Sequence, residues 1–219
     1  MKSIIFIAPP AAGKGTQSAL VSEKYHIPHI STGDLLRAAS RENNERGKYI
    51  KEQMETGGLV SDDVTTGLLK ERLQESDCDN GYILDGFPRN VEQAKAYEQI
   101  LDDLHKEMGY VIFLDIDKEI AKKRIVGRLS CSKCGAVYNS MDPNLKPKVD
   151  GICDRCFGIL SQRADDTEEI FNKRFDTYLK ETEPLIAYYE EKGVLTRIDS
   201  GLGKEKTFSQ IERMLRGSL

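Results

Sequence analysis

Residues 3–16 read SIIFIAPPAAGKGT, and this stretch decides the fold. Residues 3–7 are almost all β-branched or aromatic, which predicts a short buried strand. A turn rich in proline and glycine follows, and a helix is expected from Lys14 to Lys24. Backbone N–H groups and the helix dipole attract anions at a helix N-terminus, so Gly13 and Lys14 predict a phosphate-binding loop.

This loop departs from the general phosphate-binding pattern at three places. Glycine is expected six and three residues before the lysine, but Ala8 and Ala11 stand there. The hydroxyl residue comes one place late, as Thr16, because Gly15 follows the lysine directly. Glycine tolerates positive φ and alanine does not, so the loop either avoids positive φ at both alanines or is strained. The plainer alternative is a tight strand-to-helix turn with an incidental lysine.

Further apolar strands alternate with polar stretches of helical spacing. Strands are expected at 82–85, 110–116 and 194–198, and helices within 90–105 and 167–191. This alternation predicts an α/β fold with a parallel sheet covered by helices on both faces. The stretches 32–60 and 129–166 fit the alternation poorly, and we interpret them as insertions carried by the core.

Composition excludes several classes of protein. The chain of 219 residues is 39% hydrophobic and 31% charged, which is typical of a globular domain. Its net charge of -4 argues against dedicated nucleic-acid binding, for which a basic surface supplies most of the affinity. No apolar run approaches the roughly 18 residues that cross a bilayer. The apolar run near the N-terminus is too short for the hydrophobic region of a signal sequence. We therefore expect a cytoplasmic protein that binds neither membrane nor nucleic acid.

Four of the five cysteines form two C-x2-C pairs. Residues 135–152 separate the pairs, a spacing typical of a structural zinc ribbon. Four thiolates fill a tetrahedral site and leave no position for a reacting water, so the Zn²⁺ is expected to be structural. Iron in the same site and reduced cysteines without metal are the alternatives. Cys78 stands apart and is expected to fill core space. The four predicted zinc ligands are Cys131, Cys134, Cys153 and Cys156.

Four later motifs, taken with the loop, resemble one family along essentially the whole chain. They are STGDLLR at 31–37, DGFPR at 85–89 followed by Gln93, RIVGR at 124–128, and RADD at 163–166 followed by Arg174. In this order they resemble the adenylate kinases, nucleoside monophosphate kinases, of the long-lid, zinc-bearing type. The resemblance implies a P-loop NTPase-like core of residues 1–30, 61–126 and 167–219. It also implies a monophosphate-binding flap (residues 31–60) and a zinc-binding lid (residues 127–166).

The resemblance also assigns roles to individual residues. Its catalytic groups correspond to Lys14, Arg89, Arg124, Arg163 and Arg174. Its ATP site corresponds to Pro10, Ala11, Ala12, Gly13, Lys14, Gly15, Thr16, Arg124 and Arg128. Its AMP site corresponds to Thr32, Gly33, Arg37, Gly58, Leu59, Val60, Gly86, Phe87, Arg89, Gln93, Arg163 and Arg174. Asp85 would hold Mg²⁺ through water, since magnesium favours few carboxylates with phosphate oxygens and waters.

The implied reaction is the reversible, Mg²⁺-dependent transfer of a phosphoryl group from ATP to AMP, giving two ADP. Planar, permanently charged arginines suit it, because the reaction needs charge neutralisation and positioning instead of a covalent nucleophile. We assign no general base, and expect surface or packing roles for the three scattered histidines. Two alternatives remain: a kinase for another nucleoside monophosphate, or a nucleotide-binding relative weakened by Ala8 and Ala11. By resemblance the protein would be a monomer.

Overall fold

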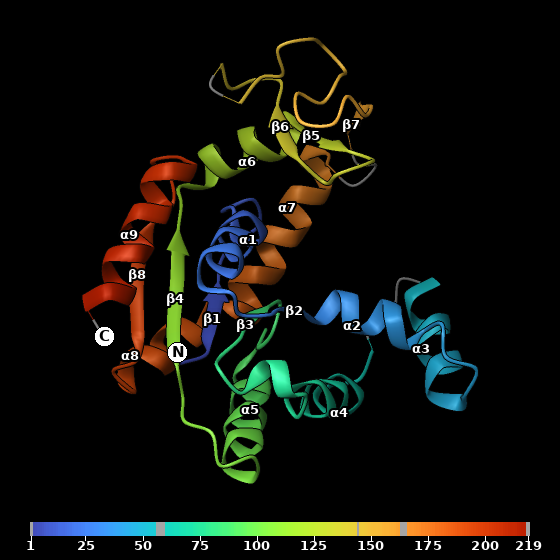
Figure 1. Ribbon diagram of the computed structural model, residues 1–219, viewed down its shortest axis with the longest axis vertical. Helices are drawn as coiled ribbons and strands as arrows, with labels where there is room; N and C mark the ends of the chain where they lie inside the picture. The colour runs from blue at the N-terminus through green and yellow to red at the C-terminus, as the bar shows by residue number, and fades with distance from the viewer. Residues whose placement is uncertain (1, 56–59, 144, 163–165, 218–219) are drawn as a thin grey trace.

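The computed structural model describes residues 2–55, 60–143, 145–162 and 166–217. Its centre is a five-stranded parallel sheet in the order β2-β3-β1-β4-β8 (Figure 1). The strands are β1 (Ile4–Ile7), β2 (His29–Ser31), β3 (Ile83–Asp85), β4 (Tyr110–Asp115) and β8 (Leu195–Asp199). Four of them confirm the predicted strands to within one or two residues, whereas β2 was not predicted.

Helices cover both faces of the sheet, as predicted. Alternate strand residues point to opposite faces, and they divide between two apolar clusters. Ile5 and Leu84 join the first cluster with helices α4 (Asp62–Leu73), α5 (Val91–Asp103) and α8 (Pro184–Glu191). Ile4 and Ile83 join the second with α1 (Lys14–Tyr25), α6 (Lys118–Val126), α7 (Glu168–Thr177) and α9 (Lys204–Gly217). The core is therefore a three-layer α/β structure.

The stretch of helical spacing at 167–191 contains two α-helices joined by a π-helical turn. This turn, η2 (Tyr178–Thr182), lies between α7 and α8. Phe175, at the end of α7, belongs to the second apolar cluster, while Tyr178 belongs to the first. The π turn thus marks the point at which this helical stretch passes from one face of the sheet to the other.

The two predicted insertions differ in structure. The flap contains α2 (Thr32–Ala39) and α3 (Glu45–Glu55). The lid contains an antiparallel sheet in the order β6-β5-β7, formed by Val137–Asn139, Arg128–Cys131 and Leu160–Ser161. Figure 1 shows the flap and the lid leaving the core on different sides. A single turn, η1 (Ser76–Cys78), follows α4. Among the described residues, no helix is both long and apolar enough to cross a membrane.

Candidate active site

The phosphate loop lies between β1 and α1, at the carboxyl end of the parallel sheet. Helix α1 begins at Lys14 without a side-chain cap, and Gly13 adopts φ 88° just before it. An uncapped helix start leaves backbone N–H groups available to an anion. The predicted helix and its place after the first strand are both confirmed.

The loop is strained at one of the two alanines. Ala11 has φ 64°, in the left-handed region that disfavours a residue with a Cβ atom. In the part of the chain described by the structure, positive φ outside glycine occurs at Ala11, His26, His105 and Phe157, and so not at Ala8. Of the two readings of the loop, strain therefore holds for Ala11, and avoidance of positive φ holds for Ala8.

Lys14 contacts a carboxylate at the end of a neighbouring strand. Its Nζ lies 3.0 Å from Oδ1 of Asp85. The two residues are close because β1 pairs with β3 in parallel, with Phe6 opposite Asp85. The other carboxylate oxygen, Oδ2, lies 3.1 Å from Nε2 of His29. Three groups from three elements of the core thus meet at this end of the sheet.

Asp85 is ionised at neutral pH. Burial alone would raise the pKa of its carboxyl group, but the hydrogen bond from His29 and the Lys14 ammonium outweigh burial and lower the pKa to about 2. An ionised carboxylate is a hard oxygen ligand of the kind that magnesium prefers, so its chemistry fits the predicted role. His29, expected in a surface or packing role, is a contact of the site that the sequence reasoning missed. No local pattern marks this contact. It follows from the pairing of β2 with β3, in which Ser31, two residues after His29, lies opposite Asp85.

The predicted monophosphate residues gather around the turn after β3. Thr32 donates through Oγ1 to the carbonyl oxygen of Gly86 over 3.1 Å, and Arg89 donates through Nε to the same oxygen over 2.9 Å. Gly86 has φ 84°, and a Cβ there would lie 3.0 Å from Thr32 Oγ1. Glycine is therefore required, by its backbone conformation and by the close approach of Thr32.

Gln93 is held at both ends of its amide. Its Oε1 accepts the backbone N–H of Arg89 over 2.8 Å, and its Nε2 donates to Oδ1 of Asp62 over 2.5 Å. Asp62 is a further contact that the sequence reasoning missed. Phe87 is buried and its ring packs edge-on against Tyr97, so its side chain is not accessible to a ligand.

The remaining predicted flap residues are not brought to one point. The exposed Arg37 pairs with Asp34 through Nη2 and Oδ1 at 2.5 Å, and Gly33 lies beside its guanidinium group. Val60 packs against the buried cluster of Ala39, Ile50 and Leu68. Gly58 and Leu59 lie outside the described residues.

Predicted site arginines in the lid and beside it also have partners in the protein. Arg124 donates through Nη2 to the carbonyl oxygens of Ser200 at 2.8 Å and Gly201 at 3.4 Å. Arg128 forms a two-pronged contact with the fully buried carboxylate of Asp166, which includes Nε to Oδ2 at 2.8 Å. Arg174 is exposed on α7. Arg163 lies outside the described residues.

The four lid cysteines form one cluster. All four Sγ atoms lie within 4.8 Å of one another, with Cys131 3.4 Å from Cys156 and Cys134 3.6 Å from Cys153. Thiolates about 2.3 Å from a tetrahedral zinc ion would be separated by about 3.8 Å, so the cluster fits such an ion. A hydrogen bond from Tyr138 lowers the pKa of Cys153 to about 6, which favours the thiolate that a metal binds.

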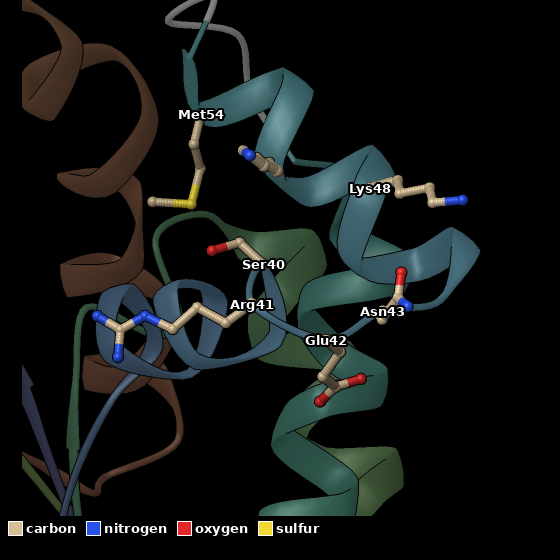
Figure 2. Close-up of a pocket in the computed structure, with 7 residues that line it drawn as sticks. Ser40, Arg41, Glu42, Asn43, Lys48 and Met54 are labelled. Carbon is tan, nitrogen blue, oxygen red and sulfur yellow. The ribbon is translucent and has the colours of Figure 1, made fainter.

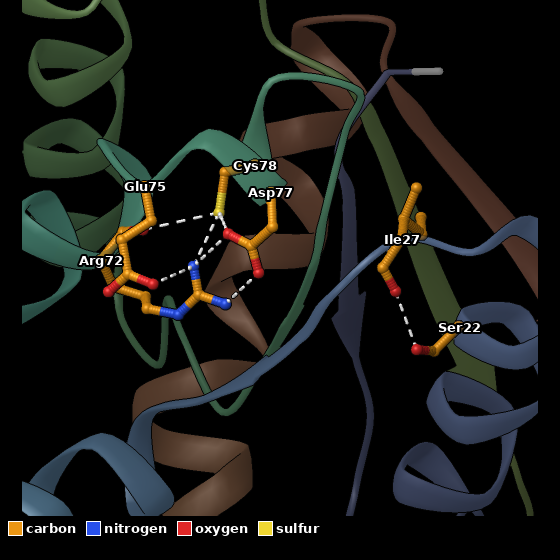
Figure 3. Close-up of polar contacts among 6 residues, drawn as sticks. All are labelled: Ser22, Ile27, Arg72, Glu75, Asp77 and Cys78. Atoms are coloured by element: carbon orange, nitrogen blue, oxygen red, sulfur yellow. Dashed lines mark hydrogen bonds and ion pairs between the residues drawn. The ribbon is translucent and has the colours of Figure 1, made fainter.

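Cys78 is separate from this cluster, and its predicted place in the core is confirmed. It is 1% exposed and belongs to the first apolar cluster. Figure 3 shows its thiol beside Arg72, whose Nη1 lies 3.0 Å from the sulfur and which also pairs with Asp77. Burial raises the pKa of the Cys78 thiol to about 11. A protonated thiol at this place is a packing group.

A cavity of about 630 Å³ opens on the flap, and none of its lining residues is among the predicted site residues. It lies between the end of α2 and one side of α3 (Figure 2). In that view Arg41 and Met54 extend toward the same side, whereas Lys48 extends the opposite way. The lining residues are Ser40, Arg41, Glu42, Asn43, Lys48, Lys51 and Met54.

A glycine-lysine loop between the first strand and first helix of a parallel sheet defines the class: a phosphate-binding α/β protein of the P-loop type. A family model described as adenylate kinase matches residues 6–194. The adenylate kinase of Archaeoglobus fulgidus is 48% identical over 97% of both chains. That of Geobacillus sp. (strain WCH70) is 45% identical over 98% of this chain and 99% of its own. That of Bacillus subtilis (strain 168) is 43% identical over 98% of both. The chain belongs to the adenylate kinase family.

Proposed function

We propose that the protein is an adenylate kinase, a nucleoside monophosphate kinase that transfers the γ-phosphoryl group of ATP to AMP and forms two ADP. One observation carries the proposal. Lys14, at the start of an uncapped helix, lies 3.0 Å from the ionised Asp85 at the end of the neighbouring strand. A cation for phosphate and a carboxylate for its metal ion are therefore adjacent, in a chain of this family.

The chain's own residues bind and orient the two nucleotides. The backbone N–H groups of the loop and Lys14 hold the triphosphate, with Arg128 on the same side. Arg37 and Arg89 hold the α-phosphate of AMP, while Thr32 and Gln93 face its base. Positioning and charge stabilisation supply the catalysis, so no covalent intermediate is needed.

Three arginines surround the transferring group in this proposal: Arg124, Arg163 and Arg174. The guanidinium of Arg124 is hydrogen-bonded to Ser200, and that of Arg128 to Asp166. A nucleotide must therefore compete for these arginines or share them with their present partners. Lid closure over ATP would bring about this exchange and exclude water from the transfer.

Two metal ions complete the proposal. Asp85 would hold Mg²⁺ through its water ligands, and the ion would neutralise phosphate charge when it is bound with ATP. Cys131, Cys134, Cys153 and Cys156 would hold Zn²⁺, and four thiolates would leave no open position for chemistry. Its role is to hold the lid together.

The function is tested by following ADP formation from ATP with AMP, UMP, CMP or GMP, with and without Mg²⁺. We expect ADP to form with AMP and not with the other three monophosphates, and only when Mg²⁺ is present. Lys14→Met should lower kcat/KM by a hundredfold or more, whereas Lys95→Met, at an exposed position of α5, should leave it unchanged. Preferred turnover of another monophosphate, or full activity of Lys14→Met, would contradict the proposal.

The strain at Ala11 favours one alternative, a nucleotide-binding relative with weakened kinase activity. We propose instead ordinary activity with at most a raised KM for ATP, because the lysine and its carboxylate are in place. Steady-state kinetics of Ala11→Gly and Ala8→Gly decide between the two. A gain of about a hundredfold in kcat would mean that the native loop is catalytically impaired.

The division into core, flap and lid, the monomeric state and the cytoplasmic location are part of the same proposal. ATP, AMP and ADP are its partners, with no nucleic acid or membrane. Light scattering on the protein as it elutes from a size-exclusion column should give a mass near 24.7 kDa. A bisubstrate analogue with two adenosines joined by five phosphates should bind tightly if the two sites face each other, and weak binding would contradict that arrangement.

A further inference from the structure

The two cysteine pairs of the lid are attached to its sheet in different ways. We call residues 131–134 the first knuckle and residues 153–156 the second knuckle. Cys131 is the last residue of β5, so the first knuckle continues directly from the sheet. The second knuckle lies in no strand, and the backbone N–H and carbonyl groups of Cys153 bond to Gly158 and Phe157 just beyond it. Its backbone is joined to the lid sheet through Gly151, whose carbonyl oxygen accepts the N–H of Leu160 in β7 over 2.8 Å, and the Cys153 thiol makes a separate contact with the sheet.

Tyr138 supplies such a contact. It lies in β6 directly opposite Leu129 of β5, and its ring packs against the lid's small apolar cluster. Its hydroxyl group lies 3.5 Å from Sγ of Cys153 and accepts the backbone N–H of Asp154 over 2.8 Å. Because that N–H occupies a lone pair of the oxygen, the hydroxyl proton is available to the sulfur. The Asp154 carboxylate in turn accepts the backbone N–H of Lys148 over 3.0 Å.

We propose that Tyr138 is a positioning residue of the metal site: its hydroxyl group donates to the Cys153 thiolate and fixes the second knuckle on the lid sheet. This role rests on the zinc site proposed above. A hydrogen bond to a charged acceptor is stronger than one between neutral groups, and partners outside the ligand set orient the ligands and tune the metal.

Sulfurs of both knuckles accept backbone N–H groups. The Cys131 sulfur accepts that of Lys133 over 3.4 Å, and the Cys153 sulfur accepts those of Arg155 and Cys156, contacts that no substitution other than proline removes. The contact of Cys153 with Tyr138 comes in addition, from a side chain of another strand. A single substitution in β6 can therefore loosen one thiolate while all four cysteines and both knuckles keep their sequence.

The test is Tyr138→Phe, which keeps the ring in the apolar cluster and removes only the hydroxyl group. The full chain is loaded with Zn²⁺, and its affinity is measured by competition with a chromophoric chelator. The same variant is loaded with Co²⁺, and its thiolate-to-cobalt charge-transfer band is recorded. Ser132→Ala is the matched control, because it also removes a lid hydroxyl, which donates to the carbonyl of Ile159 and contacts no thiol.

We expect Tyr138→Phe to bind Zn²⁺ about 10- to 100-fold more weakly, as is typical when a partner outside the ligand set is removed. We also expect its charge-transfer band to move to longer wavelength, since a thiolate without a hydrogen-bond donor gives up its electrons more easily. Ser132→Ala should match the wild type in both measurements.

Three results would overturn the proposal, and they are distinguishable. Wild-type affinity and spectrum in Tyr138→Phe would show that the hydroxyl does not act on the metal site. Weaker affinity with an unmoved band would reduce Tyr138 to a general packing role. If the wild-type chain bound neither ion, the zinc site itself would fail, and the role of Tyr138 with it.

Discussion

The flap and the lid solve the same problem by different physical means. Both are insertions in the division proposed above, and each must keep its own structure outside the core. In the flap, α2 and α3 pack with α4 around Ala39, Ile50 and Leu68, an ordinary apolar cluster. In the lid, the buried cluster is Cys131, Ala136, Cys153 and Leu160, and two of its four members are thiols.

The difference is one of architecture more than of composition. The lid has large apolar residues, but it exposes them: Val149 is 60% exposed, Ile159 69% and Phe157 81%. Two- to four-residue strands cannot cover such side chains, whereas the flap's helices are covered by α4. A segment that buries so little apolar surface needs another source of stability, and the proposed Zn²⁺ would supply it.

Removing the metal should produce the largest effect, and only in the lid. Cys153→Ser, or chelation of the wild type, should abolish stoichiometric metal binding and expose residues 127–166 to proteolysis. Structural zinc in small domains contributes about 10–16 kcal/mol of apparent binding free energy, so the loss of lid stability should be large. Thermal unfolding and proteolytic mapping measure it. Cys78→Ser, which changes a thiol outside the cluster, should keep one metal ion per chain.

The structural role proposed for this metal has a further consequence for activity. The chelated protein should retain much of its kinase activity at low temperature, because no metal-bound water takes part in the proposed transfer. Complete loss of activity in a chelated chain that is still folded would mean that the ion has a catalytic role.

Truncation of a buried side chain in the flap should have the next largest effect on the free energy of unfolding. This effect should not depend on chelator. Ile50 is fully buried, so Ile50→Ala should cost about 2–5 kcal/mol. The destabilisation should be the same with and without chelator, because distant sites contribute additively. Urea unfolding under both conditions checks this. A strong dependence on chelator would mean that flap and lid are energetically coupled.

Acid should weaken the core that carries both insertions, independently of either. The pKa of Asp85 is lowered from 3.8 to about 2, so its stabilising contribution is present above pH 4 and lost as the pH falls through 2. A shift of this size corresponds to about 2 kcal/mol. The stability difference between wild type and Asp85→Asn should therefore shrink from pH 5 to pH 2. Urea titrations measure this difference, and chelator is present throughout so that metal in the lid does not contribute. A stability difference that stays constant from pH 5 to pH 2 would contradict the prediction.

The smallest expected effect is a gain in the lid. Phe157 has φ 57° and is largely exposed, so Phe157→Gly relieves backbone strain with little loss of packing. The left-handed penalty exceeds the extra chain entropy of glycine, and the gain should be about 0.5–1 kcal/mol. It should appear in the metal-loaded protein and vanish after chelation, when the knuckle is no longer held. Thermal unfolding of both forms measures this gain in stability. An equal gain without metal would show that the strain at Phe157 does not depend on the bound metal.

Sequence patterns predicted the elements whose apolar runs are continuous. They recovered four of the five core strands. Of these, β1, β3 and β4 are buried along most of their length, whereas β8 buries Ile198 and leaves its other four residues partly or fully exposed. They missed β2, which has three residues, one of them exposed. They also missed the lid strands, because β7 has two residues and β6 exposes Val137.

The candidate site was predictable where one motif contains the chemistry. Lys14 and Asp85 each stand in a local pattern, and register alone brings them together. His29 and Asp62 were missed because their roles depend on contacts across strands and helices that no local pattern records. The residue type at position 11 indicated that the loop is either strained or avoids positive φ. Only the backbone conformation decides between the two.

The pairing of Lys14 with Asp85 bears on how binding responds to ionic strength. An unpaired lysine in a phosphate loop would carry a counterion from solution and release it when the nucleotide arrives, which makes affinity fall with added salt. Here the counterion is part of the protein, only 16% exposed, and bulk salt has little access to it. The share of nucleotide affinity that comes from Lys14 should therefore be largely salt-independent, and the salt dependence of binding should come from the exposed arginines.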